Sequence, residues 1–172
     1  MKRRDNTIKA YMSLSCKVGH YGDVFGELLK MDIPVGDIFL LFGQIDILCK
    51  FEFDTLEEFK KGWFNRVRLI GGEEAWITRT MTFIVIQSGG ETLEEPFAFI
   101  FLNTQPRNLE SVQESLLKIS QVLTADTVFG PYDVICSVRA HDQKDLERII
   151  SHIQRIPGIQ GSMTAIIAGM RV

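Results

Sequence analysis

Two aspartates have the best-placed side chains in this sequence for binding a polar ligand. Each follows a glycine by three positions, in Gly43-x-x-Asp46 and in Gly130-x-x-Asp133. A carboxylate just beyond a tight turn either accepts the turn's own amide hydrogens or binds the amino group of a ligand. The recurrence does not separate these two interpretations, because a duplication copies either one.

The segment around each aspartate belongs to a longer internal repeat. Residues 41–47 return 87 positions later as residues 128–134, and residues 80–85 are echoed by residues 162–167. A fixed internal period indicates that half of the chain is the unit of folding. The repeat therefore predicts a paired module and argues against one large active-site domain.

The composition fits a globular protein and excludes several functional classes. Hydrophobic residues make up 45% of the 172 residues, and the net charge is only −3. Basic residues gather only at 2–4, so no direct nucleic-acid binding is expected. No apolar run reaches the roughly 18 residues of a membrane span, and no secretory signal is seen. Three cysteines without framework spacing favour a reducing cytoplasm.

Hydrophobic periodicity predicts the same order of elements in each half. The first half is expected to contain strands at 8–16, 35–42, 45–53 and 76–87, a helix at 21–31, and a second helix opened by the capping box Thr55-x-x-Glu58. The second half is expected to contain strands at 97–104, 122–129, 132–140 and 159–168, with helices capped by Asn108 and Asp142. The glycines Gly43 and Gly130 are expected to occupy type II′ turns.

This order predicts an α+β protein built from two tandem ferredoxin-like (βαββαβ) units. The expected boundaries are 6–88 for the first unit, 89–96 for a polar linker and 97–172 for the second unit. Each unit would leave one apolar sheet face without helices, and such a face needs a cover. We therefore expect the two antiparallel sheets to pack face to face as a pseudo-dimer, which assembles further.

No catalytic or metal-binding constellation stands out. The three histidines, His20, His141 and His152, form no pair at metal-ligand spacing and join no Cys or Glu cluster. Cys49 and Cys136 occupy equivalent, apolar strand positions and are expected in the core. The sequence therefore predicts a protein that is not an enzyme and has no metal or cofactor.

The second half closely resembles the C-terminal effector domain of Lrp/AsnC transcriptional regulators, known as RAM for regulation of amino acid metabolism. The resemblance covers residues 97–172 and rests on Gly130-x-Tyr132-Asp133, on Ile156-Pro157-Gly158-Ile159 and on the closing Ser162-x-Thr164-x-Ile166-Ile167. Residues 8–87 look like a diverged copy, in which Ile45 replaces the tyrosine and the Ile-Pro-Gly turn is lost.

The resemblance implies a module that dimerises through its sheets, forms rings and binds an amino acid near the hairpin. Turn amides would suit the α-carboxylate, and a carboxylate with nearby hydroxyls would suit the α-ammonium. The implied ligand-binding residues are Gly130, Tyr132, Asp133, Ser162 and Thr164, with Gly43, Asp46, Thr80 and Thr82 in the first half. Full-length members carry an N-terminal DNA-binding domain, whereas only seven residues precede the first expected strand here.

The leading hypothesis is a stand-alone Lrp/AsnC-type protein that senses an amino acid, forms homo-oligomers and modulates full-length Lrp/AsnC regulators. One alternative is a dimeric α+β barrel enzyme, such as an oxygenase or a haem-dependent enzyme, with its site between the sheets. Another is an ACT-type regulatory module, which has similar topology and also binds amino acids.

Overall fold

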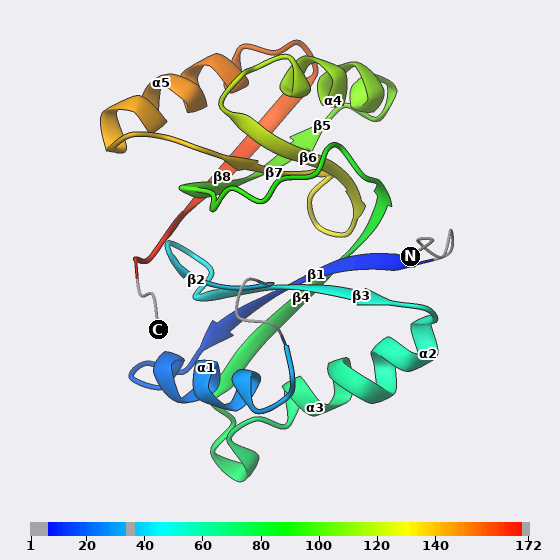
Figure 1. Ribbon diagram of the computed structural model, residues 1–172, viewed down its shortest axis with the longest axis vertical. Helices are drawn as coiled ribbons and strands as arrows, with labels where there is room; N and C mark the ends of the chain where they lie inside the picture. Colours follow the sequence, from blue (N-terminus) through cyan, green and yellow to red (C-terminus); the bar gives the residue numbers. More distant parts are fainter. Residues whose placement is uncertain (1–6, 34–36, 170–172) are drawn as a thin grey trace. The chain divides into compact units, whose positions relative to one another are not determined.

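A computed structural model describes residues 7–33 and 37–169, which divide into two compact units (Figure 1). The first unit comprises Met1–Ile84 with Ala168–Val172, and the second comprises Val85–Ile167. Within the described residues, no helix is both long enough and apolar enough to cross a membrane.

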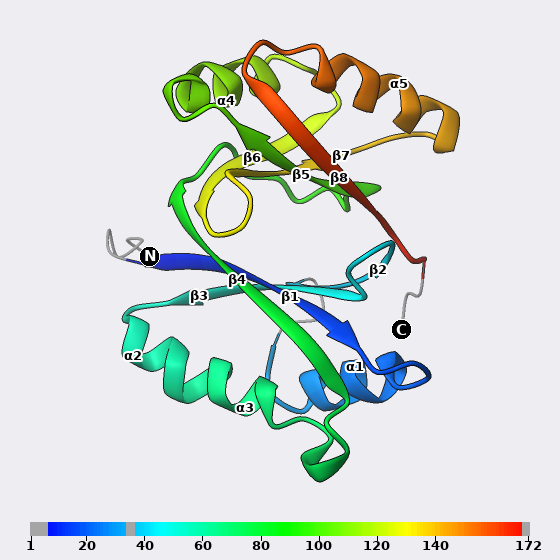
Figure 2. The same ribbon diagram turned by 180° about the vertical axis from the view of Figure 1, so that it is seen from behind.

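The first unit contains an antiparallel sheet in the order β4-β1-β3-β2. Its strands are β1 (Ile8–Cys16), β2 (Ile38–Phe42), β3 (Ile47–Phe53) and β4 (Ile77–Gln87). Helix α1 (Tyr21–Leu29) follows β1. After β3 come α2 (Leu56–Phe59), a π-helical segment (Lys60–Phe64), α3 (Asn65–Arg68) and a 3₁₀ turn (Gly72–Glu74). Figure 2 shows the same unit from behind, with its helices below the sheet.

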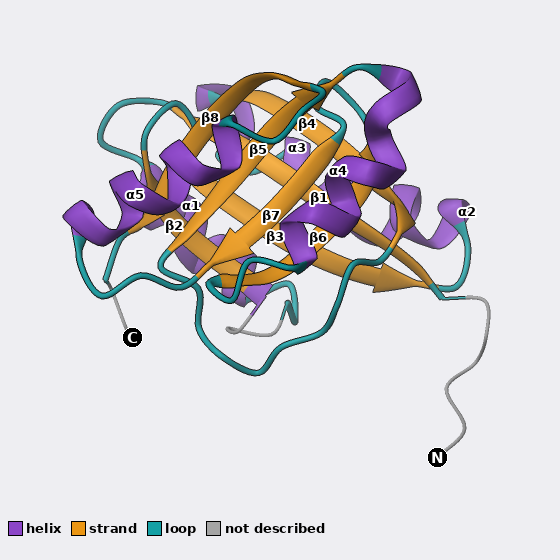
Figure 3. Ribbon diagram, turned by 90° about the horizontal axis from the view of Figure 1, so that it is seen from above, coloured by secondary structure: helices purple, strands orange, loops and turns teal. Residues whose placement is uncertain are grey.

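The second unit repeats this arrangement, with the strand order β8-β5-β7-β6. Its strands are β5 (Ala98–Thr104), β6 (Val122–Phe129), β7 (Val134–Val138) and β8 (Ile159–Ile167). A 3₁₀ turn (Pro106–Asn108) leads into α4 (Leu109–Leu117), and α5 (Gln143–Gln154) joins β7 to β8. Both helices lie over the same face of the sheet (Figure 3). The mixed α/β fold with antiparallel sheets is as predicted and is consistent with the ferredoxin-like pattern.

The internal repeat extends to the register of the strands. Leu14 of β1 lies opposite Ile47 and Thr80, and Leu102 of β5 lies opposite Val134 and Ser162. The pairing of β1 with β4 shifts between Ser15 and Cys16, and that of β5 with β8 shifts between Asn103 and Thr104. The two halves therefore share the same β-bulge at the end of the central strand.

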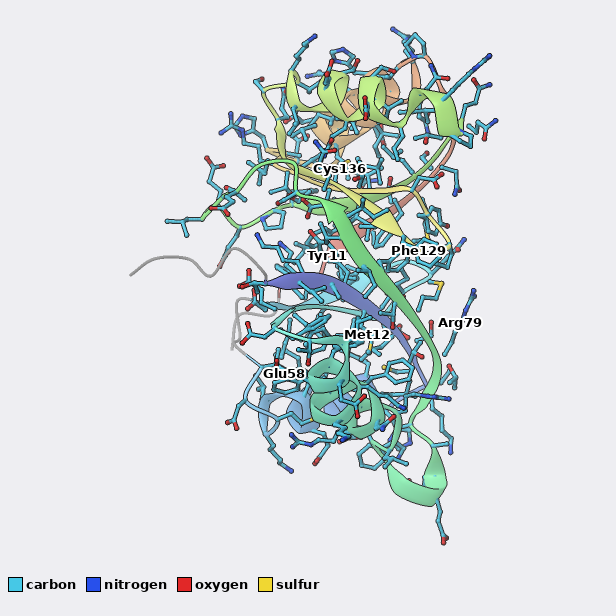
Figure 4. The ribbon with its side chains drawn as sticks, turned by 90° about the vertical axis from the view of Figure 1, so that its right-hand side faces the viewer. Tyr11, Met12, Glu58, Arg79, Phe129 and Cys136 are labelled. Carbon is cyan, nitrogen blue, oxygen red and sulfur yellow. The ribbon has the colours of Figure 1, made fainter. Side chains whose placement is uncertain are left out.

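Each unit buries its own apolar core between the sheet and its helices. In the first unit, alternate residues of β1 such as Met12 pack with Val24 and Leu28 of α1. Figure 4 shows Met12 and Tyr11 on opposite sides of β1, as strand alternation requires. In the second unit, Ile100 and Cys136 are fully buried in the equivalent core. The core positions expected for Cys49 and Cys136 are confirmed.

The hairpin turns differ from the prediction. The amide of Leu41 donates to the carbonyl of Asp46 (2.8 Å), and that of Val128 donates to the carbonyl of Asp133 (2.9 Å). Each hairpin therefore closes over a loop of four residues, 42–45 and 129–132, so the expected two-residue type II′ turn is wrong. Gly43 has a φ of 141°, whereas the φ of Gly130 is not positive.

Two of the three predicted helix caps are confirmed. The hydroxyl of Thr55 accepts from the Glu58 amide (3.1 Å), and the Asp142 carboxylate accepts from the Asp145 amide (2.8 Å). The Glu58 side chain, labelled in Figure 4, reaches back to the amide of Asp54 (2.9 Å). Asn108 stands at the N-cap of α4, but its side chain makes no capping hydrogen bond.

The second helix of the first unit begins with an exposed leucine. Leu56, the first residue of α2, is 58% exposed, and Phe59 in the same helix is buried. Residues 34–36, at the start of the strand expected at 35–42, lie outside the described residues.

The start of the expected linker is bound to the second unit. The amide of Ala125 donates to the carbonyl of Gly89 (2.8 Å), and the Gly89 amide donates to the Asp126 carboxylate (2.9 Å). The side-chain amide of Gln113 donates to the carbonyls of Gln87 (3.4 Å) and Ala125 (2.8 Å). Asp126 and Gln113 are buried polar residues whose hydrogen-bonding groups are used by this contact.

The cysteines are expected to be unreactive in the folded protein. Burial, with a smaller contribution from the Asp46 carboxylate, raises the pKa of Cys16 to about 12. Burial likewise raises the pKa of Cys136 to about 12 and that of Cys49 well above its usual range. A disulfide reagent at mildly alkaline pH should therefore label the thiols only after denaturation.

The same shifts predict a decline in stability at high pH. Because the folded-state pKa values are raised, the thiols contribute fully to stability below their unfolded pKa, about 8.5. That contribution is lost as the pH rises toward 12. Denaturant titrations over this range test it, and a cysteine-free variant should show a smaller loss. Fast labelling of the native protein by the disulfide reagent would contradict the expected lack of thiol reactivity.

Candidate functional site

The predicted aspartate of the second unit supports the β-bulge at the end of β5. Oδ2 of Asp133 accepts from the amide of Thr104 (2.8 Å), and the Asp133 amide donates to the carbonyl of Leu102 (2.9 Å). The bulge between Asn103 and Thr104 takes this amide out of the regular strand ladder. The carboxylate therefore has a structural partner through Oδ2.

Asp46 makes the same contacts in the first unit. Its Oδ2 accepts from the amide of Cys16 (2.6 Å), and its amide donates to the carbonyl of Leu14 (3.0 Å). The sequence left open whether these aspartates bind turn amides or a ligand. In both units the carboxylate holds an amide of the neighbouring strand, which is a structural role that differs from turn capping.

Tyr132 lies on the sheet face that the helices leave uncovered. Its ring packs against Phe101 (centroids 5.6 Å apart), and its hydroxyl reaches the sulfur of Met163 (3.7 Å). Phe101 and Met163 are opposite each other on β5 and β8, and they alternate with residues that face the helices. The side-chain amide of Asn103 donates to the carbonyl of Pro131 (3.1 Å) and so fastens the loop that carries Tyr132.

Ser162 and Thr164 lie on the other face of the sheet. They are opposite Leu102 and Ile100, which belong to the core beneath the helices. The exposed hydroxyl of Ser162 accepts from the side-chain amide of Gln154 on α5 (2.8 Å). Within the second unit, Ser162 and Thr164 therefore do not share a sheet face with Tyr132.

The first unit keeps hydroxyl side chains at the equivalent strand positions but lacks the tyrosine. Ile45 takes the place of Tyr132 and is only 1% exposed. Thr80 and Thr82 lie opposite Leu14 and Met12, on the helix-covered face. Gly43 lies in the exposed hairpin loop, as Gly130 does in the second unit.

Sequence reasoning did not select three polar residues that the fold gathers at this end of the second unit. They are Asn103, Thr104 and Asn108, and each lies within five residues of the end of β5. Only the position of the bulge would have pointed to them, and the position of a bulge depends on strand register. The three histidines lie on helices or loops, and the described residues contain no group of three side chains able to hold a metal.

The bulge-and-carboxylate arrangement of the second unit lies inside a segment with known relatives. Residues 97–169 match the Lrp/AsnC ligand binding domain. The predicted resemblance of the second half is thereby confirmed. The matched residues include Asp133 and the whole of β5 through β8.

The curated relatives of this Lrp/AsnC-type segment are transcriptional regulators. An uncharacterised HTH-type transcriptional regulator of Pyrococcus abyssi is 31% identical over 78 residues, covering 45% of this chain and 49% of the relative. The HTH-type transcriptional regulator FL11 of the same organism is 26% identical over 70 residues, covering 41% and 46%. The chain thus spans about half the length of the curated relatives it matches.

Solved structures with low sequence identity share the fold over nearly the whole chain. The siroheme decarboxylase NirDL has a TM-score of 0.61 at 8% identity, covering 95% of this chain and 72% of its own. An anthrone oxidase-like protein has a TM-score of 0.57 at 11% identity, covering 98% and 94%. A chlorite dismutase variant from Candidatus Nitrospira defluvii has a TM-score of 0.58 at 10% identity, covering 96% and 92%. These likenesses concern the fold alone and carry no activity to this chain.

Proposed function

We propose that this chain is a non-enzymatic ligand-binding and oligomerisation protein of the Lrp/AsnC type, which senses an amino acid. The observation that supports the proposal is the end of β5 in the segment matching the Lrp/AsnC ligand binding domain. There, Asp133 keeps one carboxylate oxygen beyond its bond to Thr104, beside the exposed loop of Gly130. A carboxylate oxygen suits an α-ammonium group, and loop amides suit an α-carboxylate.

The proposal extends to the remaining site residues and to the organisation of the chain. Tyr132, Ser162 and Thr164 would contact the ligand around the same strand end. Units bounded at 6–88 and 97–172 would cover each other's helix-free sheet faces as a pseudo-dimer, since an apolar face needs a cover. Homo-oligomers, or mixed assemblies with full-length Lrp/AsnC regulators, would transmit the bound state to transcription.

A thermal-shift screen against the twenty amino acids tests the sensing function. A ligand present at about a hundred times its dissociation constant adds about 2.7 kcal/mol, which for a chain of this size raises the midpoint by roughly 5–10 °C. We expect one or two amino acids to give such a rise and the others to give none. A flat response across the whole panel would contradict the proposal.

A further inference from the structure

Two buried oxygen atoms of the second unit have no hydrogen-bond partner among the described residues. They are Oγ1 of Thr104, whose residue is 95% buried, and Oδ1 of Asn108. An unsatisfied buried polar atom costs about 1–3 kcal/mol, so native proteins rarely leave two of them in one small unit. The two atoms therefore indicate a binding partner that supplies hydrogen-bond donors.

Both residues border the same corner, where β5 leads into α4 beside the start of β8. Thr104 lies opposite Ile159, and the amide of Gln105 donates to the carbonyl of Gly158 (2.9 Å). Asn108 packs directly on Gly158, because a Cβ atom at that glycine would lie 2.5 Å from the Cβ of Asn108. The amide of Thr104 is bound to Asp133, which places that carboxylate at the same strand end.

The first unit has an equivalent corner with different contents. There the amide of Lys17 donates to the carbonyl of Trp76 (2.7 Å), just as Gln105 donates to Gly158. Cys16 and His20 thus stand where the second unit has Thr104 and Asn108, and Trp76 stands in place of Gly158. The repeat makes this a matched comparison within one chain.

In the first unit, the polar atoms of His20 and Trp76 have partners on nearby carboxylates. The rings of His20 and Trp76 stack with centroids 5.1 Å apart and planes 12° from parallel. Nδ1 of His20 lies 3.1 Å from a carboxylate oxygen of Asp23, and Nε1 of Trp76 donates to Glu74 (2.7 Å). Cys16 brings a thiol, a weak hydrogen-bonding group, where Thr104 brings a hydroxyl.

We infer that the Thr104–Asn108 corner binds the ammonium group of a ligand, at one site per chain and in the second unit only. Two oxygen atoms beside a carboxylate form an acceptor set, and a primary ammonium supplies three donors without accepting any bond. The inference rests on the proposed function and deepens it, because it states where the amino group of an effector binds and how many effectors a chain holds.

The test compares Thr104→Val with wild type in the full chain, using methylammonium chloride as the probe. At equal salt concentration, methylammonium should raise the thermal midpoint of the wild type above its value in sodium chloride, and Thr104→Val should lose this rise. The midpoint without the probe should not fall, because the substitution removes an unpaired buried hydroxyl without changing the side-chain shape. Cys16→Val, at the equivalent position of the first unit, is the control and should keep the response.

Calorimetric titration with an amino acid identified in the screen then gives the stoichiometry, expected to be one per chain. Equal thermal midpoints of the wild type in methylammonium chloride and sodium chloride would overturn the inference. A rise in midpoint with methylammonium that survives Thr104→Val would also overturn it, as would a stoichiometry of two sites per chain. An amino acid that still binds Thr104→Val normally would overturn the inference and leave the proposed function standing. A methylammonium response without any amino acid binding would support the corner and contradict amino acid sensing.

Discussion

The substitution Gly89→Ala is expected to destabilise the protein by roughly 3–5 kcal/mol, which lowers the midpoint of thermal unfolding by about 10 °C. An added Cβ atom would overlap the carbonyl oxygen of Ala125, which belongs to the backbone of β6 and cannot move aside. Displacing Gly89 breaks the hydrogen bond that its carbonyl accepts from the Ala125 amide and the one that its own amide donates to the buried carboxylate of Asp126. Leaving a buried charge with too few partners is among the costliest single changes. Equilibrium denaturation measures the loss.

The control for this substitution is Gly26→Ala. Gly26 lies inside α1, and an added Cβ atom there meets nothing within 4 Å. Alanine should stabilise that helix by about 0.5–1 kcal/mol, since glycine is a poor helix former. If both variants changed stability by similar small amounts, the segment around Gly89 would not be docked on β6 as described.

Removing either hairpin carboxylate, with Asp46→Ala or Asp133→Ala, is expected to cost about 2–3 kcal/mol. Each change takes the acceptor from an amide in the bulge of the neighbouring strand, that of Cys16 or Thr104. Because the two contacts lie in different units, the losses should add in the double variant to within a few tenths of a kcal/mol. Urea denaturation of the three variants tests both statements.

The matched pair also separates structure from ligand binding. Loss of an amino acid response in Asp133→Ala alone would be ambiguous, because the same change loosens the end of β5. The proposal requires the response to disappear in Asp133→Ala and to persist in Asp46→Ala, although both lose comparable stability. Equal losses of response in the two variants would argue that the carboxylates act only through the bulges.

The sequence predicted the fold well because its strongest signals were local and occurred twice. Strand β1 and helix α5 begin where alternation and the Asp142 cap placed them. The π-helical segment Lys60–Phe64 was not predicted, because a one-residue change of helical pitch leaves the spacing of Phe59, Trp63 and Val67 nearly helical. The four-residue hairpin loops were also missed, since a glycine permits several turn types and the strand register selects among them.

The candidate site was predicted less completely. Spacing identified Asp133, but it could not show that the carboxylate holds the Thr104 amide, because that contact joins two residues 29 positions apart in sequence. Thr104 and Asn108 resemble ordinary strand-end and capping residues in the sequence. Only burial and the absence of a side-chain cap in the structure distinguish them. Long-range register, rather than residue type, therefore limited the prediction.

The boundary between the two units lies inside β4, and this limits where the chain can be cut into fragments. The residues of β4 through Ile84 belong to the first unit, and those from Val85 onward belong to the second. Ala168 belongs to the first unit again, where its amide donates to the carbonyl of Leu40 (2.8 Å). A fragment covering 97–169, the whole of the matched domain, would lack the donors that Ser88 and Gly89 give to Asp126. A fragment cut at residue 97 should therefore be less stable than one that begins at Val85, where the second unit starts.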